Sequence, residues 1–122
     1  MNVLLCEDDP SYAETVQFMF TLFAPDDTVY HVQTLSAALA LLVHQPPIDV
    51  ILLDLNLPDA KNLQALTAMS ATAADIPIIV LTAYPMWRDQ AMEIGAKAYK
   101  VKSDISGEAL VDTVHMIVHE EL

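Results

Sequence analysis

Five short apolar runs, separated by longer stretches with helical spacing, constrain the fold of this 122-residue chain more than any other feature. The runs are rich in Val, Ile and Leu, and we expect each of them to form a strand. They lie at Val3–Cys6, Thr28–Val32, Ile48–Leu53, Ile76–Leu81 and Ala98–Val101. Strands that are apolar at nearly every position are buried on both faces, which is typical of a parallel sheet.

Helical patterns fill the intervals between these runs. We expect helices at Pro10–Phe23, Leu35–His44, Asn62–Met69, Pro85–Ile94 and Ser106–His119. Asp9 and Pro10 suit a helix start, and Gly95 suits the residue just past a helix end. The strict alternation of strand and helix predicts a single three-layer α/β domain over residues 1–122, with no linker and no internal repeat.

The charge of the chain limits its partners. Five Lys and Arg residues stand against 17 Asp and Glu, which gives a net charge of −12, and the first 60 residues contain no Lys or Arg. Nucleic-acid binding depends on basic clusters that meet phosphates, so binding to DNA or RNA is not expected, nor is binding to an anionic membrane. Metal cations and basic protein surfaces are the favoured partners.

The sequence also gives an expectation about the compartment. No basic segment precedes the first apolar run, and all the apolar runs are too short to cross a bilayer. Cys6 is the single cysteine and fits a small buried apolar residue. We therefore expect a cytoplasmic protein without a disulfide bond.

Polar residues stand directly after four of the expected strands: Glu7 and Asp8, Asp54, Thr82, and Lys102. Ligands of such folds lie outside the carboxyl ends of the strands, where the strand order reverses. With the order 2-1-3-4-5, the first and third strands are neighbours and the three carboxylates share one pocket. Carboxylates this close raise one another's pKa or demand a cation, and Mg²⁺ prefers oxygen ligands. Asp54 can then be the nucleophile of a phosphoryl transfer, with Lys102 supplying positive charge and Thr82 a hydroxyl donor.

Each of these residues also has a simpler interpretation. Asp8 or Asp9 alone after a strand is usually a helix cap, and a lone Thr82 or Lys102 usually has no special role. Asp54 is harder to dismiss, because an acid that follows a buried apolar run needs a partner. The complete set at four strand ends is more specific than any one of its members.

The last helix and the segment before the fourth helix carry weaker signals. His115 and His119 are four residues apart with Glu120 adjacent, so they can bind a metal, although solvated helix residues explain them more simply. Trp87 and Met86 can anchor a partner or pack on the core.

Apolar residues crowd the first helix: Phe18, Phe20, Leu22 and Phe23. A partner surface and ordinary core packing are both open as explanations. Asp59 and Lys61 are expected to belong to the loop that contains them and to its solubility.

Four segments resemble the receiver domain of two-component response regulators, and together the resemblance covers essentially the full chain. They are LLCEDDP at 4–10, DVILLDLNLPD at 49–59, IIVLTA at 78–83 and GAKAYKVK at 95–102. The resemblance implies a flavodoxin-like fold with strand order 2-1-3-4-5 and Mg²⁺ as the cofactor. It also implies a signalling protein rather than an enzyme, one that catalyses only its own Mg²⁺-dependent phosphorylation and dephosphorylation.

The resemblance implies roles for residues after the first and third strands. Asp54 resembles the phosphoacceptor, which takes a phosphoryl group from phosphohistidine. Glu7 and Asp8 resemble the acidic pair that holds Mg²⁺ directly or through water. The backbone carbonyl of Asn56 would add one more ligand.

The resemblance implies further roles at the ends of the fourth and fifth strands. Thr82 and Lys102 resemble the phosphate contacts of the family, and Ala83 would offer a backbone N–H. Tyr99 matches the aromatic switch position that moves with Thr82. The implied partners are a histidine kinase or histidine phosphotransfer protein, and a second copy or downstream effector bound at the first helix or at the face of the fourth helix, fifth strand and fifth helix.

Three features depart from the family pattern. Ser103 follows Lys102 where the family has Pro, and a cis bond before a non-proline residue costs about 3 kcal/mol, so the usual cis-proline turn is not expected. Lys102 is then expected to be less firmly placed. Asn62 stands where many members have Gly, and Asn tolerates a left-handed backbone better than most residues. The segment between Thr82 and Gly95 is slightly shorter than usual.

Two other functions were weighed against a phosphorylatable receiver. The first is a receiver-like protein-binding module that is not phosphorylated, which the departures at Ser103 and after Thr82 would suit. The second is a phosphatase with an Asp nucleophile. Phosphatases of this kind, which resemble haloacid dehalogenases, place the nucleophile after the first strand and need a cap segment for substrate specificity. In this sequence the best candidate nucleophile, Asp54, follows the third strand.

Overall fold

The chain was studied as a computed structural model that describes residues 1–44 and 47–120. A sheet of five parallel strands forms its centre, in the order β2-β1-β3-β4-β5. The strands are β1 (Asn2–Cys6), β2 (Thr28–Val32), β3 (Val50–Leu53), β4 (Ile78–Thr82) and β5 (Ala98–Val101). This confirms the expected α/β fold, including the strand order.

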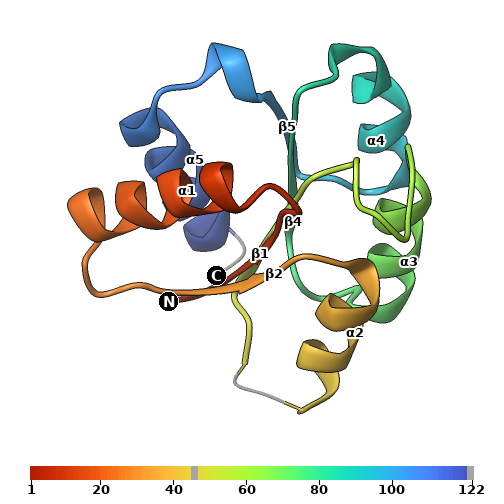
Figure 1. Cartoon of the computed structure of the whole chain (residues 1–122), viewed down its shortest axis with the longest axis horizontal. Helices are drawn as coiled ribbons and strands as arrows, with labels where there is room; N and C mark the ends of the chain where they lie inside the picture. Colours follow the sequence, from red (N-terminus) through yellow and green to blue (C-terminus); the bar gives the residue numbers. More distant parts are fainter. Residues whose placement is uncertain (45–46, 121–122) are drawn as a thin grey trace.

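Five α-helices and two short 3₁₀ turns connect the strands. The helices are α1 (Pro10–Phe23), α2 (Leu35–His44), α3 (Gln64–Thr72), α4 (Arg88–Ile94) and α5 (Gly107–Glu120). The 3₁₀ turns are η1 (Pro85–Trp87) and η2 (Lys102–Asp104). Helices α1 and α5 cover one face of the sheet, and α2, α3 and α4 cover the other (Figure 1). Among the described residues no helix is both long enough and apolar enough to cross a lipid bilayer.

Alternation along the strands explains why their sequences are apolar throughout. In β3, Val50 and Leu52 face the cluster under α1 and α5, whereas Ile51 and Leu53 face the cluster under α2, α3 and α4. All four are fully buried. Because successive side chains point to opposite faces and both faces are covered, a polar residue inside this strand would be buried without water.

Two strand boundaries differ from the expected ones for local reasons. Strand β3 begins two residues later than Ile48, because the Asp49 carboxylate turns back to accept a hydrogen bond from the backbone N–H of Asn2 at 2.6 Å. Strand β4 also begins later than Ile76, because Pro77 has no N–H to give to the ladder.

The starts of three helices also differ from expectation. Asn62 has φ of +53°, a left-handed conformation that cannot continue a helix, so α3 begins at Gln64. The tolerance expected of Asn at this position is thereby confirmed. A 3₁₀ turn precedes α4, and α5 begins one residue after Ser106. Every described peptide bond is trans, including the bond before Ser103.

Candidate functional site

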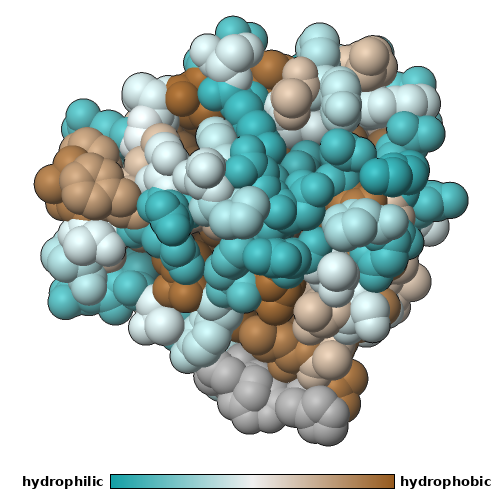
Figure 2. Space-filling view, in the orientation of Figure 1, coloured by the Kyte–Doolittle hydropathy of each residue, from teal (hydrophilic) through white to brown (hydrophobic). Residues whose placement is uncertain are grey.

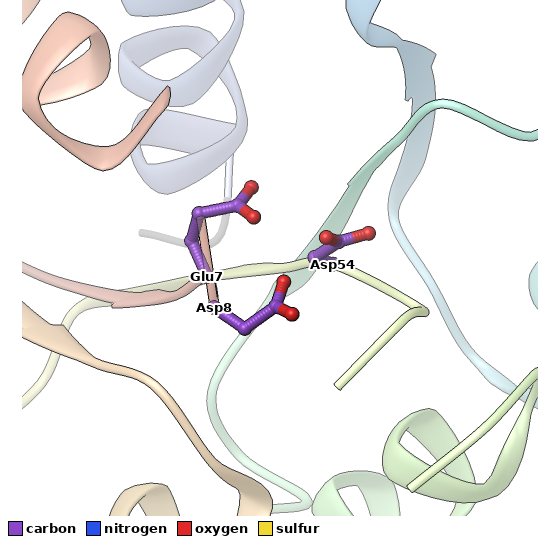
Figure 3. A group of neighbouring side chains, drawn as sticks. All are labelled: Glu7, Asp8 and Asp54. Atoms are coloured by element: carbon purple, nitrogen blue, oxygen red, sulfur yellow. The ribbon is translucent and has the colours of Figure 1, made fainter. Parts of the chain in front are cut away.

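Three carboxylates converge at the carboxyl ends of β1 and β3. The pairing of Cys6 with Leu53 brings the next residues of the two strands out side by side, and the Asp54 N–H donates to the Cys6 carbonyl at 3.0 Å. Glu7, Asp8 and Asp54 then each offer an oxygen atom within 4.8 Å of the others. Figure 3 shows the three carboxylates gathered at these strand ends. The structure therefore brings together the acidic residues that the strand ends predicted.

Burial makes this arrangement electrostatically demanding. Glu7 is 1% exposed and Asp54 is 5% exposed, while Asp8 is half-buried. Burial raises the pKa of Glu7 to about 7, with the negative charge of Asp54 adding to the rise and the hydrogen bond from Lys102 opposing it. The centre of the face drawn in Figure 2 is hydrophilic. A buried cluster of this kind is stabilised by any positive charge that enters it.

The ammonium of Lys102 supplies one such charge. Its Nζ lies 2.7 Å from Oε1 of Glu7 and 3.3 Å from Oδ2 of Asp54. Burial by itself would lower the pKa of Lys102, but the hydrogen bond to Glu7 and the negative charges of Asp54 and Glu7 outweigh it and leave the pKa above its ordinary value. The lysine is therefore charged and faces the pocket although Ser103 follows it.

Backbone contacts hold the acidic loop after β1 in place. The Glu7 N–H donates to the Val32 carbonyl at 3.0 Å, and the Glu7 carbonyl lies 2.7 Å from Nε2 of His31. Asp9 caps α1 by accepting from the Ser11 N–H at 2.9 Å. Asp9 is therefore the aspartate that caps the helix, whereas the carboxylate of Asp8 belongs to the acidic cluster.

The loop after β3 adds a second set of contacts. The Asn56 N–H donates to Oδ1 of Asp54 at 3.3 Å, and the Asn56 side-chain oxygen accepts from Nζ of Lys61 at 3.2 Å. Asp59 accepts from the N–H groups of Leu35 and Ser36 at 2.8 and 2.9 Å. Lys61 thus acts within this loop, as expected, whereas Asp59 also binds the start of α2, which the sequence did not predict.

Thr82 and Tyr99 lie on the β4–β5 side of the pocket. Thr82 is fully buried at the end of β4, and its hydroxyl accepts from the Tyr84 N–H at 3.4 Å. Tyr99 points inward and is 1% exposed, its hydroxyl donates to the Tyr84 carbonyl, and the Arg88 guanidinium lies 5.2 Å from the centre of its ring. The backbone of Tyr84 is thus hydrogen-bonded to both Thr82 and Tyr99. Ala83, which lies between Thr82 and Tyr84 in the sequence, is exposed.

The residues of the last helix and of the segment before α4 lie outside the acidic cluster. His115 places Nε2 2.6 Å from Oδ2 of Asp27, and its ring centre is 6.0 Å from that of His119. In the described part of the chain, the acidic cluster is the only group of three possible ligands with atoms within 4.8 Å, so a metal site at His115 and His119 is not supported. Trp87 is half-buried against the core, whereas Met86 is 63% exposed.

Two residues that contact the site were not singled out from the sequence, Tyr12 and His31, and the contact of Asp59 with the start of α2 was not expected either. The Tyr12 ring centre lies 4.4 Å from Nζ of Lys102. An aromatic residue on the first turn of the helix after the acidic loop was the available signal for Tyr12. No spacing rule connects His31 or Asp59 to its partner.

The contact between Asp59 and α2 gives a testable prediction. The N–H groups of Ser36 and Leu35 lower the pKa of Asp59, so its contribution to stability is present above pH about 4 and is lost as the pH falls through the lower pKa of the folded state. We expect Asp59→Ala to lower the melting temperature at pH 7, because two N–H groups at the start of α2 lose their acceptor. The difference from wild type should shrink below pH 4.

Thermal unfolding followed by circular dichroism at several pH values would measure this difference. Asp75→Ala, which changes another exposed aspartate in the turn before β4, is the matched control. An equal loss in both variants would show that only net charge matters.

Comparison with known proteins identifies the family of the chain. The sequence model described as "Response regulator receiver domain" matches residues 3–115. The chain is 31% identical over 118 residues to the uncharacterized transcriptional regulatory protein YhcZ of Bacillus subtilis, covering 93% of this chain and 53% of that protein. It is also 31% identical over 120 residues to the cell cycle response regulator CtrA of Brucella ovis, covering 97% and 50%. The chain spans about half the length of the curated relatives it matches.

Solved structures give the same result for the fold. The CheY-like receiver domain protein of Methanospirillum hungatei superposes with a TM-score of 0.85 at 19% identity, covering 98% of this chain and 94% of that one. The Mn(2+)-bound form of response regulator Rcp1 superposes with a TM-score of 0.75 at 27% identity, covering 98% and 91%. With the family match over residues 3–115, these findings establish that the chain belongs to the response regulator receiver domain family.

Proposed function

We propose that residues 1–122 form a phosphorylatable receiver domain in which Asp54 accepts a phosphoryl group from phosphohistidine in a Mg²⁺-dependent reaction. The observation that carries this proposal is the buried Asp54 carboxylate, placed with two further carboxylates within 4.8 Å and with a lysine ammonium at 3.3 Å. Family membership already connects the chain to two-component signalling. The proposal adds the chemistry of the site.

The donor set fits a divalent cation. Oxygen atoms of Glu7, Asp8 and Asp54 would hold Mg²⁺, with the backbone carbonyl of Asn56 as a further ligand. The raised pKa of Glu7 is consistent with this assignment, because it comes first from burial and then from the negative charge of Asp54, and a bound cation would stabilise the charged carboxylate against both. Bound Mg²⁺ would neutralise negative charge on the phosphoryl oxygens. Response regulator Rcp1, which has a similar structure, is known in a Mn(2+)-bound form, and this supports a divalent ion here.

Asp54 provides the nucleophile. One of its oxygens attacks phosphorus, a P–O bond forms, and the P–N bond to the donor imidazole breaks with its electron pair returning to nitrogen. Lys102 already faces Oδ2 of Asp54 and would balance the charge of the transferred group. The Thr82 hydroxyl accepts from Tyr84, which leaves its own proton available to a phosphoryl oxygen. Attack by water on the acyl phosphate would restore Asp54.

Output would run through the Thr82–Tyr99 side of the site. A Thr82 hydroxyl drawn to the phosphoryl group would move the segment that contains Tyr84, to which Tyr99 is hydrogen-bonded. The populations of two arrangements of α4, β5 and α5 would then shift. A histidine kinase or histidine phosphotransfer protein would be the donor, and a second copy or an effector would bind the α4-β5-α5 face or α1.

The direct test is covalent labelling. The chain is incubated with Mg²⁺ and acetyl phosphate, and intact-mass spectrometry is expected to show one added phosphoryl group that chelation of Mg²⁺ prevents. Borohydride reduction followed by peptide mapping should place the label at Asp54. No uptake from any small donor would favour the binding module that is not phosphorylated, and a label on His115 or His119 would contradict the assignment of Asp54.

A further inference from the structure

Lys102 has a third partner besides the two carboxylates. The ring of Tyr12, on the first turn of α1, lies with its centre 4.4 Å from Nζ of Lys102. Nζ is also 2.7 Å from Glu7 and 3.3 Å from Asp54. A cation at this distance from the face of a tyrosine ring is attracted by the electron density of that face. The ammonium is therefore held by two charged groups and one uncharged group.

The backbone around Lys102 does not fix its side chain. Lys102 begins the 3₁₀ turn η2, and Ser103 follows it through a trans peptide bond. The side chain is long and half-buried, so its position depends on what the ammonium contacts. In contrast, Tyr12 is carried by a helix whose start is fixed by the Asp9 cap and by Pro10.

The three partners of Lys102 differ in what else they are proposed to do. Glu7 is the nearest partner and also a proposed Mg²⁺ ligand, so an oxygen engaged by the cation attracts the ammonium less. Asp54 is the proposed acceptor, and its charge passes to the phosphoryl group. The ring of Tyr12 binds no Mg²⁺ and takes no phosphoryl group, so its contact with the ammonium persists through both events.

We propose that Tyr12 is a positioning residue whose ring face keeps the Lys102 ammonium beside Asp54 while Glu7 and Asp8 are engaged with the metal. This inference rests on the proposed function. It accounts for an ordered Lys102 in a chain that lacks a proline at position 103. The face of the ring performs the role, and the Tyr12 hydroxyl is not needed for it.

Two substitutions separate the ring from the hydroxyl. Tyr12→Phe keeps the aromatic face, and Tyr12→Leu keeps an apolar side chain without it. Each variant is titrated with Mg²⁺ alone and with beryllofluoride at saturating Mg²⁺, by calorimetry, because beryllofluoride mimics the phosphoryl group on a carboxylate. We expect Tyr12→Leu to weaken beryllofluoride binding about fivefold. Its Mg²⁺ affinity should stay within about twofold of wild type, and Tyr12→Phe should match wild type in both titrations.

A second measurement reports the contact itself. The ε-methylene protons of Lys102 should show an upfield ring-current shift by NMR in wild type and in Tyr12→Phe, and this shift should disappear in Tyr12→Leu. Binding of beryllofluoride by Tyr12→Leu at wild-type affinity, or an equal loss in the Phe and Leu variants, would overturn the role of the ring and leave the proposed function intact. Failure of the wild-type chain to bind beryllofluoride with Mg²⁺ would overturn the proposed function together with this inference.

Discussion

Asp54→Asn is expected to abolish phosphoryl uptake from acetyl phosphate while leaving the chain folded. The amide is a poor nucleophile and cannot form the acyl phosphate, so the loss should be complete rather than partial. The same substitution removes one of three acidic groups that lie within 4.8 Å of one another, and the charge of Asp54 is one of the causes that raise the pKa of Glu7. The pKa of Glu7 in the metal-free protein should therefore fall below its wild-type value of about 7.

Both readouts can be made on the same variant. Intact-mass spectrometry follows uptake, and carbon NMR of the Glu7 carboxyl follows its titration. Asp75→Asn makes the same change of charge at an exposed position outside the site and should alter neither quantity. Phosphoryl uptake at an undiminished rate in Asp54→Asn would remove Asp54 as the acceptor, and an unchanged Glu7 pKa would show that the two carboxylates do not interact.

The largest loss of stability is expected for Phe20→Ala. Phe20 is 1% exposed on α1 and packs in the cluster formed with β1, β3, β4 and α5. Truncating a buried Phe removes apolar burial and leaves a cavity that the surroundings fill only in part, which costs about 3–5 kcal/mol. Urea unfolding should show a lower midpoint with an unchanged slope.

Phe18→Ala is the matched control, with the same change in the same helix. Phe18 is 65% exposed, so its truncation should alter the free energy of unfolding by no more than about 0.5 kcal/mol. Side chains two residues apart on an α-helix point to nearly opposite sides of it. Phe18 and Phe20 are therefore expected to respond differently to the same substitution. Similar losses from the two variants would mean that the α1 surface around Phe18 is buried in solution, for instance in a dimer.

The Phe18 result bears on an alternative that the sequence left open. Phe18 and Leu22, 65% and 59% exposed, lie outside the core, while Phe20 is inside it. Figure 2 shows a hydrophobic patch over α1 on the surface. Core packing therefore explains Phe20, whereas a partner surface at the exposed Phe18 and Leu22 stays a prediction.

Sequence patterns determined the layers, and together with the strand order that the family resemblance implied they predicted the acidic cluster. Runs such as 50–53 are apolar at every position because both faces of the sheet are covered. This pattern can be recognised from the sequence alone. Glu7 and Asp54 could be placed together because residues that follow neighbouring parallel strands emerge at the same edge of a sheet.

Only the tertiary structure decided which side chains hold those residues in place. Tyr12 over Lys102, Asp59 on the start of α2 and His115 on Asp27 join elements far apart in the sequence, the last pair by 88 positions. Such contacts depend on side-chain length and direction and on how helices pack on the sheet. Repeating patterns along the chain encode which face a residue occupies, whereas the partner it meets there is set by the packing of the whole fold.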